Sequence, residues 1–179
     1  PGNQMPSLDT CLFHRMVSEI KSCAKTLPLE QNQVNQSSYL FIGRSKEKWR
    51  RLENEKDITS EFKKYFPIYE LNPSSLDAKD QVLSYDNARL VCTVVGGASP
   101  TIMFCKRGSI IVELISPNFA GDWGARIWCA LLGLNYWRIT GSFSENNVNK
   151  GTLPIDQDFS VSLKAFTAPI KQLLEILSK

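Results

Sequence analysis

The stretch Leu90-Val91-Cys92-Thr93-Val94-Val95-Gly96-Gly97 decides the fold class of this chain. Its first part, up to Val95, is the most β-branched run in the sequence, which is typical of a central buried strand. The two glycines end that run, and residues 101–106 then predict a short helix, with Gly108 placed where a C-terminal cap belongs. A strand, a glycine turn and a helix in this order make one β-α unit of an α/β domain.

Further units of the same kind lie on both sides of this stretch. Short apolar runs predict four more strands, at residues 39–43, 68–71, 110–115 and 135–139. Alternating strands and helices predict a doubly wound α/β fold, with a mostly parallel, five-stranded sheet and helices on both faces. We assign residues 38–179 to this Rossmann-like domain and residues 1–37 to an N-terminal helix and linker.

Helical spacing and capping residues predict the helices. In residues 8–27 the apolar side chains that recur at helical spacing are Leu12, Met16, Ile20 and Ala24, with Phe13 and Val17 beside them. Residues 46–55 have helical propensity, Asp57 is expected to cap the next helix, and Ser74 or Ser75 the one after it. Residues 123–132, ended by Gly133, and residues 163–177 predict two more, and Pro169 is expected to kink or split the last.

Composition limits the possible functions. With 42% hydrophobic and 22% charged residues, the 179-residue chain has the composition of one globular domain. A net charge of +3 is too small to indicate a nucleic-acid partner, and no apolar run is long enough to cross a membrane. The single histidine, His14, is expected to face solvent and excludes a histidine-based metal cluster within the chain. We interpret the five scattered cysteines as buried free thiols.

The loop after the central strand is the first candidate binding site, because ligands of such sheets bind beyond the carboxyl ends of the strands. Gly96 and Gly97 let the backbone approach a ligand closely, and the start of the next helix presents free N–H groups that suit a phosphate. The loop is neither GxGxxG nor a Walker loop. A plain tight turn explains it equally well, and both interpretations stay open.

Arg44 follows the first strand directly and opens a run, residues 44–51, that holds five basic residues. The planar fork of arginine makes two hydrogen bonds to phosphate oxygens, which makes Arg44 a candidate ligand of a diphosphate. For Lys46 and Lys48 we favour an ordinary solvated surface.

Two carboxylates are further candidates. Glu113 lies inside an apolar strand, where it would accept hydrogen bonds from ribose hydroxyls or belong to a buried ion pair or an edge position. Asp122 stands at a helix start and is more simply an N-cap than a catalytic carboxylate. Tyr136 and Trp137 are interpreted as core residues.

Taken in order, these segments resemble glycosyltransferase family 61. The family has a strand, an arginine and a basic-aromatic stretch that ends in Asn-Glu, which here read Leu40-Phe41-Ile42-Gly43-Arg44 and Trp49-Arg50-Arg51-Leu52-Glu53-Asn54-Glu55. Its helix with glutamine and alanine, its glycine-rich loop, its strand with a glutamate and its closing segment correspond to residues 80–90, 96–104, 108–114 and 132–136. The resemblance covers about residues 38–140.

The resemblance implies the donor-binding, C-terminal half of a GT-B enzyme, a two-Rossmann architecture that usually needs no metal. The implied ligands of the donor are Arg44, Gly97, Ala98, Ser99 and Thr101 for the diphosphate and Glu113 for the nucleoside, with Arg50, Asn54 and Asp122 as further candidates. Two positions depart from the family: Gly96 replaces a histidine, and Ser99 replaces the second glycine. We assign no catalytic base, cofactor or metal ligand.

The implied activity is inverting, metal-independent transfer of a hexose or pentose from a nucleotide sugar, with UDP favoured, to a glycan acceptor in polysaccharide or capsule synthesis. We expect an N-terminal half of the same enzyme as partner, the isolated chain to be inactive, and a location in the cytoplasm or at its membrane face. One alternative is a non-catalytic Rossmann-like module for nucleotide or partner binding, which the changes at Gly96 and Ser99 favour. An oxidoreductase is a weaker alternative, since GxGxxG is absent.

Overall fold

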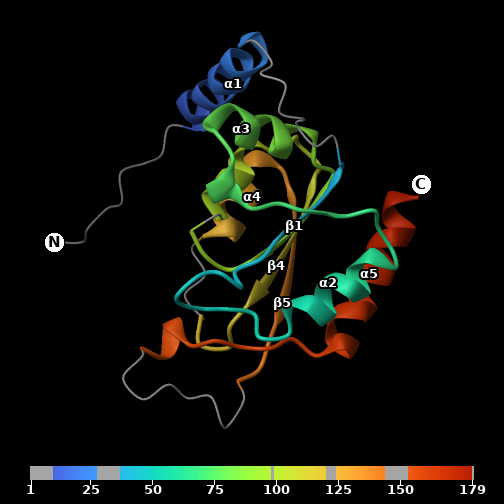
Figure 1. Cartoon of the computed structure of the whole chain (residues 1–179). Helices are drawn as coiled ribbons and strands as arrows, with labels where there is room; N and C mark the ends of the chain where they lie inside the picture. Colours follow the sequence, from blue (N-terminus) through green and yellow to red (C-terminus); the bar gives the residue numbers. More distant parts are fainter. Residues whose placement is uncertain (1–9, 28–36, 98, 120–123, 144–152, 179) are drawn as a thin grey trace, which may run out of the picture.

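The computed structural model describes residues 10–27, 37–97, 99–119, 124–143 and 153–178. Its centre is a five-stranded sheet in the order β2-β1-β3-β4-β5 (Figure 1). The strands are β1 (Tyr39–Ile42), β2 (Tyr69–Glu70), β3 (Leu90–Val94), β4 (Ile110–Ile115) and β5 (Asn135–Thr140). Every pairing between neighbours is parallel, which confirms the predicted doubly wound α/β fold.

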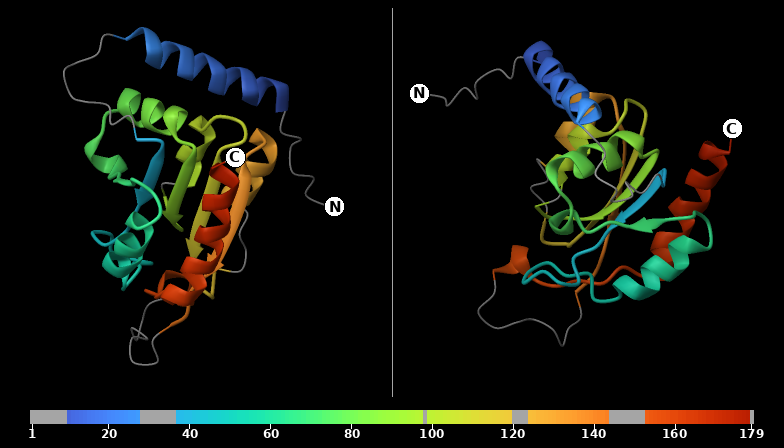
Figure 2. Two further views of the ribbon diagram at one scale, coloured as in Figure 1. Left: turned by 90° about the vertical axis from the view of Figure 1, so that its right-hand side faces the viewer. Right: turned by 45° about the horizontal axis from the view of Figure 1, so that its top comes forward.

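Helices cover both faces of the sheet (Figures 1 and 2). On one face α2 (Glu55–Lys63) packs against α5 (Leu163–Leu177). The other face carries α3 (Ala78–Asn87), the 3₁₀ helix η2 (Ser99–Phe104) and α4 (Ala125–Leu132), and α1 (Thr10–Thr26) lies across α3 on the outside. Two further 3₁₀ turns are η1 (Pro73–Ser75) and η3 (Pro154–Asp156). Because both faces are covered, every residue of β3 and β4 is buried, including Glu113.

The first helix is confirmed, but only part of the predicted apolar stripe packs: Ala24 is buried, whereas Leu12, Met16 and Ile20 are not. Those three side chains remain 65%, 45% and 38% exposed. Phe13 and its buried neighbours face the body instead, and its ring stacks on Trp128 of α4 with ring centres 5.1 Å apart. Apolar side chains occur on more than one side of this helix, so their spacing alone does not select the packed side.

Several helix starts differ from the prediction. Residues 46–54 are turns and extended backbone rather than helix, and α2 begins at Glu55, which places Asp57 in its first turn rather than at its cap. The cap of α3 is Asp77, whose Oδ1 accepts a hydrogen bond from the Asp80 backbone N–H at 2.7 Å. Ser74 and Ser75 belong to η1, which Asn72 caps. Each error arose because several adjacent residues can cap, and tertiary packing selects among them.

Pro169 does not split the last helix. α5 is one α-helix of 15 residues with Pro169 inside it, capped by the Ser162 hydroxyl, which accepts from the Ala165 backbone N–H at 3.2 Å. Phe166 and Ile170 on either side of the proline are fully buried. Burial of that apolar face compensates for the backbone hydrogen bond that a proline cannot make.

Corrections also apply to the side chains expected in the core. Cys92, Cys105 and Cys129 are buried and free as predicted, whereas Cys11 and Cys23 are exposed on α1. Tyr136 and Trp137 are only partly buried, because β5 is an edge strand. Within the described ranges, no helix combines the length and the apolar character that a membrane crossing requires.

Candidate functional site

The sheet has a switch point between β1 and β3. The chain leaves β1 outward to β2 and returns to β3 on the other side of β1. Arg44 follows β1, and Gly96 and Gly97 follow β3, so the structure brings these segments together at the carboxyl edge. This is the edge and the position at which open α/β sheets bind ligands.

The Arg44 side chain is held in place by the loop that follows it. Its Nε and Nη2 donate to the backbone carbonyl of Trp49 at 3.3 and 3.1 Å, and its backbone N–H donates to Glu55 Oε2 at 2.6 Å. Partial burial, and after it the positive charge of Arg50, lower the pKa of Arg44 below its usual value. Two guanidinium groups thus lie close enough to repel each other at the switch point, which favours an anion between or beside them.

Gly96 is in contact with Arg44. A Cβ built on Gly96 would lie 2.6 Å from Arg44 Cζ and closer still to Nη1, distances that real Cβ atoms do not show. At Gly97, by contrast, no residue that the structure describes lies within 4 Å of a built Cβ. The guanidinium therefore fills the side-chain space of residue 96, and open space remains beside residue 97.

Glu55 packs against the carboxyl end of β1. Its carboxylate lies where a side chain on Gly43 would stand, so a larger residue at position 43 would displace the Glu55 carboxylate. The same carboxylate accepts the backbone N–H of Arg44 and lines a hollow of about 220 Å³ between the carboxyl ends of β1 and β2, together with Arg44, Glu70 and Asn72. The glutamate of the Asn-Glu pair thus positions Arg44.

Arg50 occupies an unusual position beside Arg44. Its backbone has φ 57°, and it is the one non-glycine residue with positive φ in the described part of the chain. Its guanidinium lies over the ring of Phe119, with Cζ 5.5 Å from the ring centre, and its Nε is 3.6 Å from Asp156 Oδ1. The charge of Arg50 acts on Arg44, which places the two arginines near each other at the carboxyl edge of the sheet.

Asn54 does not reach the switch point. Its side-chain amide donates to the Val161 carbonyl at 2.7 Å, and its carbonyl oxygen accepts from the Val161 backbone N–H at 3.1 Å. This pair of hydrogen bonds joins the segment before α2 to the segment before α5. The structure thus gives Asn54 an observed role in holding two chain segments together.

Glu113 lies in the interior of the sheet rather than at its edge. It is 2% exposed, and the Tyr136 hydroxyl of β5 donates to its Oε2 at 2.7 Å. Its charge also contributes, after burial, to raising the pKa of Cys129 to about 12. Glu113 therefore sits beneath α4, with its carboxylate engaged by protein groups.

The remaining predicted ligands belong to the loop after β3 and to the segment before α4. Ser99 and Thr101 are in η2, and Thr101 lies beside the hydroxyl of Tyr85. Burial raises the pKa of Tyr85 to about 12, and the hydrogen bond with Thr101 opposes this shift. The short helix predicted over residues 101–106 is the 3₁₀ helix η2, which begins at Ser99 and ends at Phe104. Ala98 and Asp122 lie outside the residues that the structure describes.

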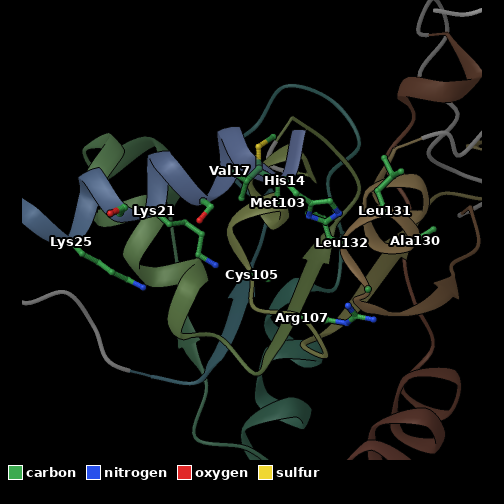
Figure 3. A pocket seen from close by; sticks show the side chains of 13 residues that line it. His14, Val17, Lys21, Lys25, Met103, Cys105, Arg107, Ala130, Leu131 and Leu132 are labelled. Atoms are coloured by element: carbon green, nitrogen blue, oxygen red, sulfur yellow. The ribbon is translucent and has the colours of Figure 1, made fainter. Parts of the chain in front are cut away.

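A second hollow, of about 550 Å³, lies at the opposite, amino edge of the sheet (Figure 3). His14, exposed as predicted, and Lys21 line it from α1, and Arg107 lines it from the turn before β4. Lys21 and Lys25 each bind one oxygen of the buried Asp86, at 2.6 and 2.8 Å. These lysines attach α1 to α3. The C-termini of helices at this edge also stabilise positive charge, so the basic side chains here do not indicate a bound ligand.

Sequence reasoning missed the segment of residues 156–161. Asp158 binds Arg51 through three hydrogen bonds of 2.6–2.9 Å, and Phe159 pairs with Leu52 in a parallel bridge. No element and no role was predicted for this segment. Its Asp-x-Asp-Phe pattern opposite Arg50 and Arg51 was the available signal, but no spacing rule links segments 107 positions apart.

The model of the family Glycosyltransferase 61 matches residues 5–112, which is more than half of the chain and includes α1, Arg44, Arg50 and the loop after β3. Glu113 and the closing segment at residues 132–136 lie beyond that match. Among curated proteins, none matches this chain. The extent of the family match, on a sheet of the expected kind, shows that the chain belongs to glycosyltransferase family 61.

Proposed function

We propose that this chain holds the nucleotide-sugar donor of a glycosyltransferase, with the donor's diphosphate at the switch point between Arg44 and Gly97. The observation that supports this most directly is the position of Arg44 at the carboxyl edge: its guanidinium donates to the Trp49 carbonyl and fills the space beside Gly96, and its backbone N–H donates to Glu55. Open space beside Gly97 leaves room for phosphate oxygens to approach the backbone. UDP is the nucleotide we propose, and residues 38–179 are the part that binds it.

The proposed chemistry is inverting and needs no metal. A base removes the proton of an acceptor hydroxyl, that oxygen attacks the anomeric carbon, and the nucleoside diphosphate leaves with an additional negative charge. Arg44, with Arg50 beside it, would stabilise this charge, since cations fixed near a developing anion act in the transition state without reorganisation. A hexose or pentose would then pass to a glycan acceptor in polysaccharide synthesis.

Titration with UDP tests this proposal. Amide chemical shifts of the 179-residue chain, recorded with EDTA and without magnesium, should change for Arg44, Gly96 and Gly97. Cytidine, which lacks phosphate, is the control ligand and should leave these amides unchanged. Absence of shifts at these residues with millimolar UDP would contradict the proposed site.

We also propose that the chain alone transfers sugar too slowly to serve as an enzyme. The described residues form a single sheet, whereas the reaction centre of a GT-B enzyme lies between two Rossmann-like domains. Holding donor and acceptor together contributes roughly 7–11 kcal/mol in favourable cases. Slow hydrolysis of a UDP-sugar is therefore the expected activity, and robust transfer to an acceptor by the purified chain would contradict it.

A second candidate function is nucleotide binding without transfer. The observation that favours it is Gly96, which stands where the family has a histidine and whose side-chain space Arg44 occupies. A module of this kind would bind UDP and leave a UDP-sugar intact over hours. Detection of free sugar by NMR separates the two candidates.

A further inference from the structure

We infer that Trp49, with Asp156 beside it, binds the acceptor glycan at the carboxyl edge of the sheet. The inference rests on the proposed function for its role in the reaction, because a glycan here would lie next to the diphosphate of the donor. Its structural evidence is separate. It comes from a group of side chains that the proposed diphosphate site does not use, namely Trp49, Leu153, Ile155 and Asp156.

Three large apolar side chains of this group are exposed at neighbouring positions. Trp49 is 38% exposed, Ile155 42% and Leu153 66%. Two backbone hydrogen bonds bring their segments together: the Arg50 N–H donates to the Asp156 carbonyl at 3.1 Å, and the Asp156 N–H donates to the Leu153 carbonyl at 2.8 Å. Figures 1 and 2 show the orange-red stretch with η3 beside the cyan loop that follows β1. Apolar side chains that gather on a surface beside polar groups are typical of a binding site, whereas scattered ones are not.

The peptide bond between Trp49 and Arg50 is fixed on both sides. Its carbonyl accepts two hydrogen bonds from the Arg44 guanidinium, at 3.3 and 3.1 Å, and its N–H is the group that donates to Asp156. The positive φ of Arg50, 57°, turns the chain directly after the tryptophan. A ring on an anchored backbone loses little conformational freedom when a ligand binds, so this position is preorganised.

One face of the Trp49 ring is open to a partner from outside the core. The Lys48 ammonium lies over it, with Nζ 4.6 Å from the ring centre. The electron-rich face that attracts this cation also attracts the C–H groups of a sugar ring, which carry partial positive charge. Lys48 is exposed and has a flexible stem, so a sugar can displace it from the ring.

Asp156 supplies the hydrogen-bonding group that a sugar also needs. Its carboxylate is partly exposed, and its Oδ1 is 3.6 Å from Arg50 Nε, too far for a hydrogen bond, which leaves lone pairs for other donors. Sugar hydroxyls donate to a carboxylate from the rim of the ring, while the face of the ring presents C–H groups. An aromatic ring with a carboxylate beside it therefore suits a sugar better than a purely apolar ligand.

The position of the group favours the acceptor over the donor's own sugar. Arg44 Nη1 lies against Gly96, whereas its Nε and Nη2 face the Trp49 carbonyl. The guanidinium thus separates the tryptophan from the space beside Gly97, where the diphosphate is proposed. The exposed apolar surface continues from Trp49 over the turn η3, which suits several linked sugars rather than one. A glycan held here would lie close to the donor, as transfer requires.

The test follows the indole N–H signal of Trp49 in NMR spectra of the unaltered 179-residue chain. Xylohexaose and the hexamer of N-acetylglucosamine, each added at millimolar concentration, should shift this signal. Trp49→Leu removes the ring and keeps an apolar side chain, so the affinity, measured from the amide shift of Ile155, should fall roughly threefold to tenfold. Trp49→Phe should restore part of the loss. Leu12→Ala, which removes a more exposed apolar side chain on α1, is the control and should bind like the parent.

A Trp49 signal that stays fixed with both oligosaccharides would overturn the inference, as would parent-like affinity in Trp49→Leu. A signal that moves with uridine alone would assign the ring to the nucleoside, and one that moves with UDP-xylose but with neither UDP nor an oligosaccharide would assign it to the donor's sugar. Both results overturn the inference. If oligosaccharides shift Trp49 while UDP leaves Arg44 and Gly97 unchanged, the inference stands and the proposed function fails. If UDP shifts Arg44 and Gly97 and no oligosaccharide shifts Trp49, the reverse holds.

Discussion

The guanidinium of Arg44 occupies the space in which a side chain on Gly96 would lie. Arg44 follows β1 and Gly96 follows β3, so the contact spans the switch point of the sheet. Glycine at position 96 thus has a steric consequence in this chain: a side chain there would force Arg44 away from the Trp49 carbonyl. The two positions are coupled, which can be measured.

Gly96→Ala should displace Arg44 and weaken UDP binding. The new Cβ collides with the guanidinium, which must leave the Trp49 carbonyl to make room. In an Arg44→Ala background the same change should be nearly neutral, giving a coupling energy of about 0.5–3 kcal/mol in a double-mutant cycle. Gly124→Ala is the control, because it lies outside the proposed site and no described residue lies within 4 Å of a Cβ built there. Additive effects of the two substitutions would show that the contact has no energetic weight.

Arg44→Ala should cost about 1.5–3 kcal/mol of UDP binding, the range for a hydrogen bond to a charged group. Arg44→Lys should restore only part of it, because lysine cannot make the planar, two-bond contact. Calorimetric titration of both variants gives the affinities, and Lys46→Ala, in the same hollow, is the control. Parent-like affinity in both Arg44 variants would make Arg44 an ordinary surface charge.

Asp158→Ala should lower the free energy of unfolding by about 1–3 kcal/mol, since it leaves a partly buried N–H without its acceptor. Asp158 accepts from the Arg51 backbone at 2.8 Å and from its guanidinium at 2.9 and 2.6 Å, and it is 8% exposed. Urea denaturation measures the loss. Glu70→Ala removes the exposed Lys63–Glu70 pair and should cost only about 0–1 kcal/mol. Equal costs for the two variants would argue against a structural role for residues 156–161.

The attachment of α1 should weaken in acid. Burial by itself would raise the pKa of Asp86, but the hydrogen bonds and charges of Lys21 and Lys25 outweigh it and hold the pKa below its usual value. Because the folded pKa is the lower one, the stabilisation is complete above the unfolded pKa of about 3.9 and is lost as pH falls through the folded pKa.

Stability measured by urea denaturation from neutral to acidic pH should therefore decline less steeply for Asp86→Asn than for the parent. The variant lacks the carboxylate that must take up a proton. Glu19→Gln, which alters an exposed carboxylate of the same helix, serves as the control. Identical acid dependence of Asp86→Asn and the parent would show that the two lysine pairs contribute nothing measurable.

Much of the fold could be read from local patterns. The runs of residues 90–95 and 110–115 predicted strands because continuous β-branched and aliphatic residues suit a sheet covered on both faces, and both are fully buried. Helix starts were less accurate. Asp77 rather than Ser74 or Ser75 caps α3, since a cap requires the chain to turn at that point, and several neighbouring residues offer a suitable oxygen.

Only part of the candidate site could be predicted from the sequence. Arg44 was identified because a residue directly after a parallel strand must stand at the ligand-binding edge. Glu113 could not be placed in the same way: strand position predicts burial, but not that Tyr136 of the next strand would bind the carboxylate. Asn54 was a candidate only because it belongs to the Asn-Glu pair of the family resemblance. Its hydrogen bond to Val161 could not be predicted from neighbouring residues.

The amino-acid sequence alone settled the fold class, the strand ends and the presence of a basic segment after the first strand, because these depend on residue order and on periodicities of a few residues. Tertiary structure decided which groups meet: Arg44 with Gly96, and Arg51 with Asp158 from 107 positions away. Such contacts depend on how crossovers and returning segments pack in three dimensions. The sequence alone would allow an arginine to pair with any of several carboxylates, and the packing of the backbone determines which pair forms.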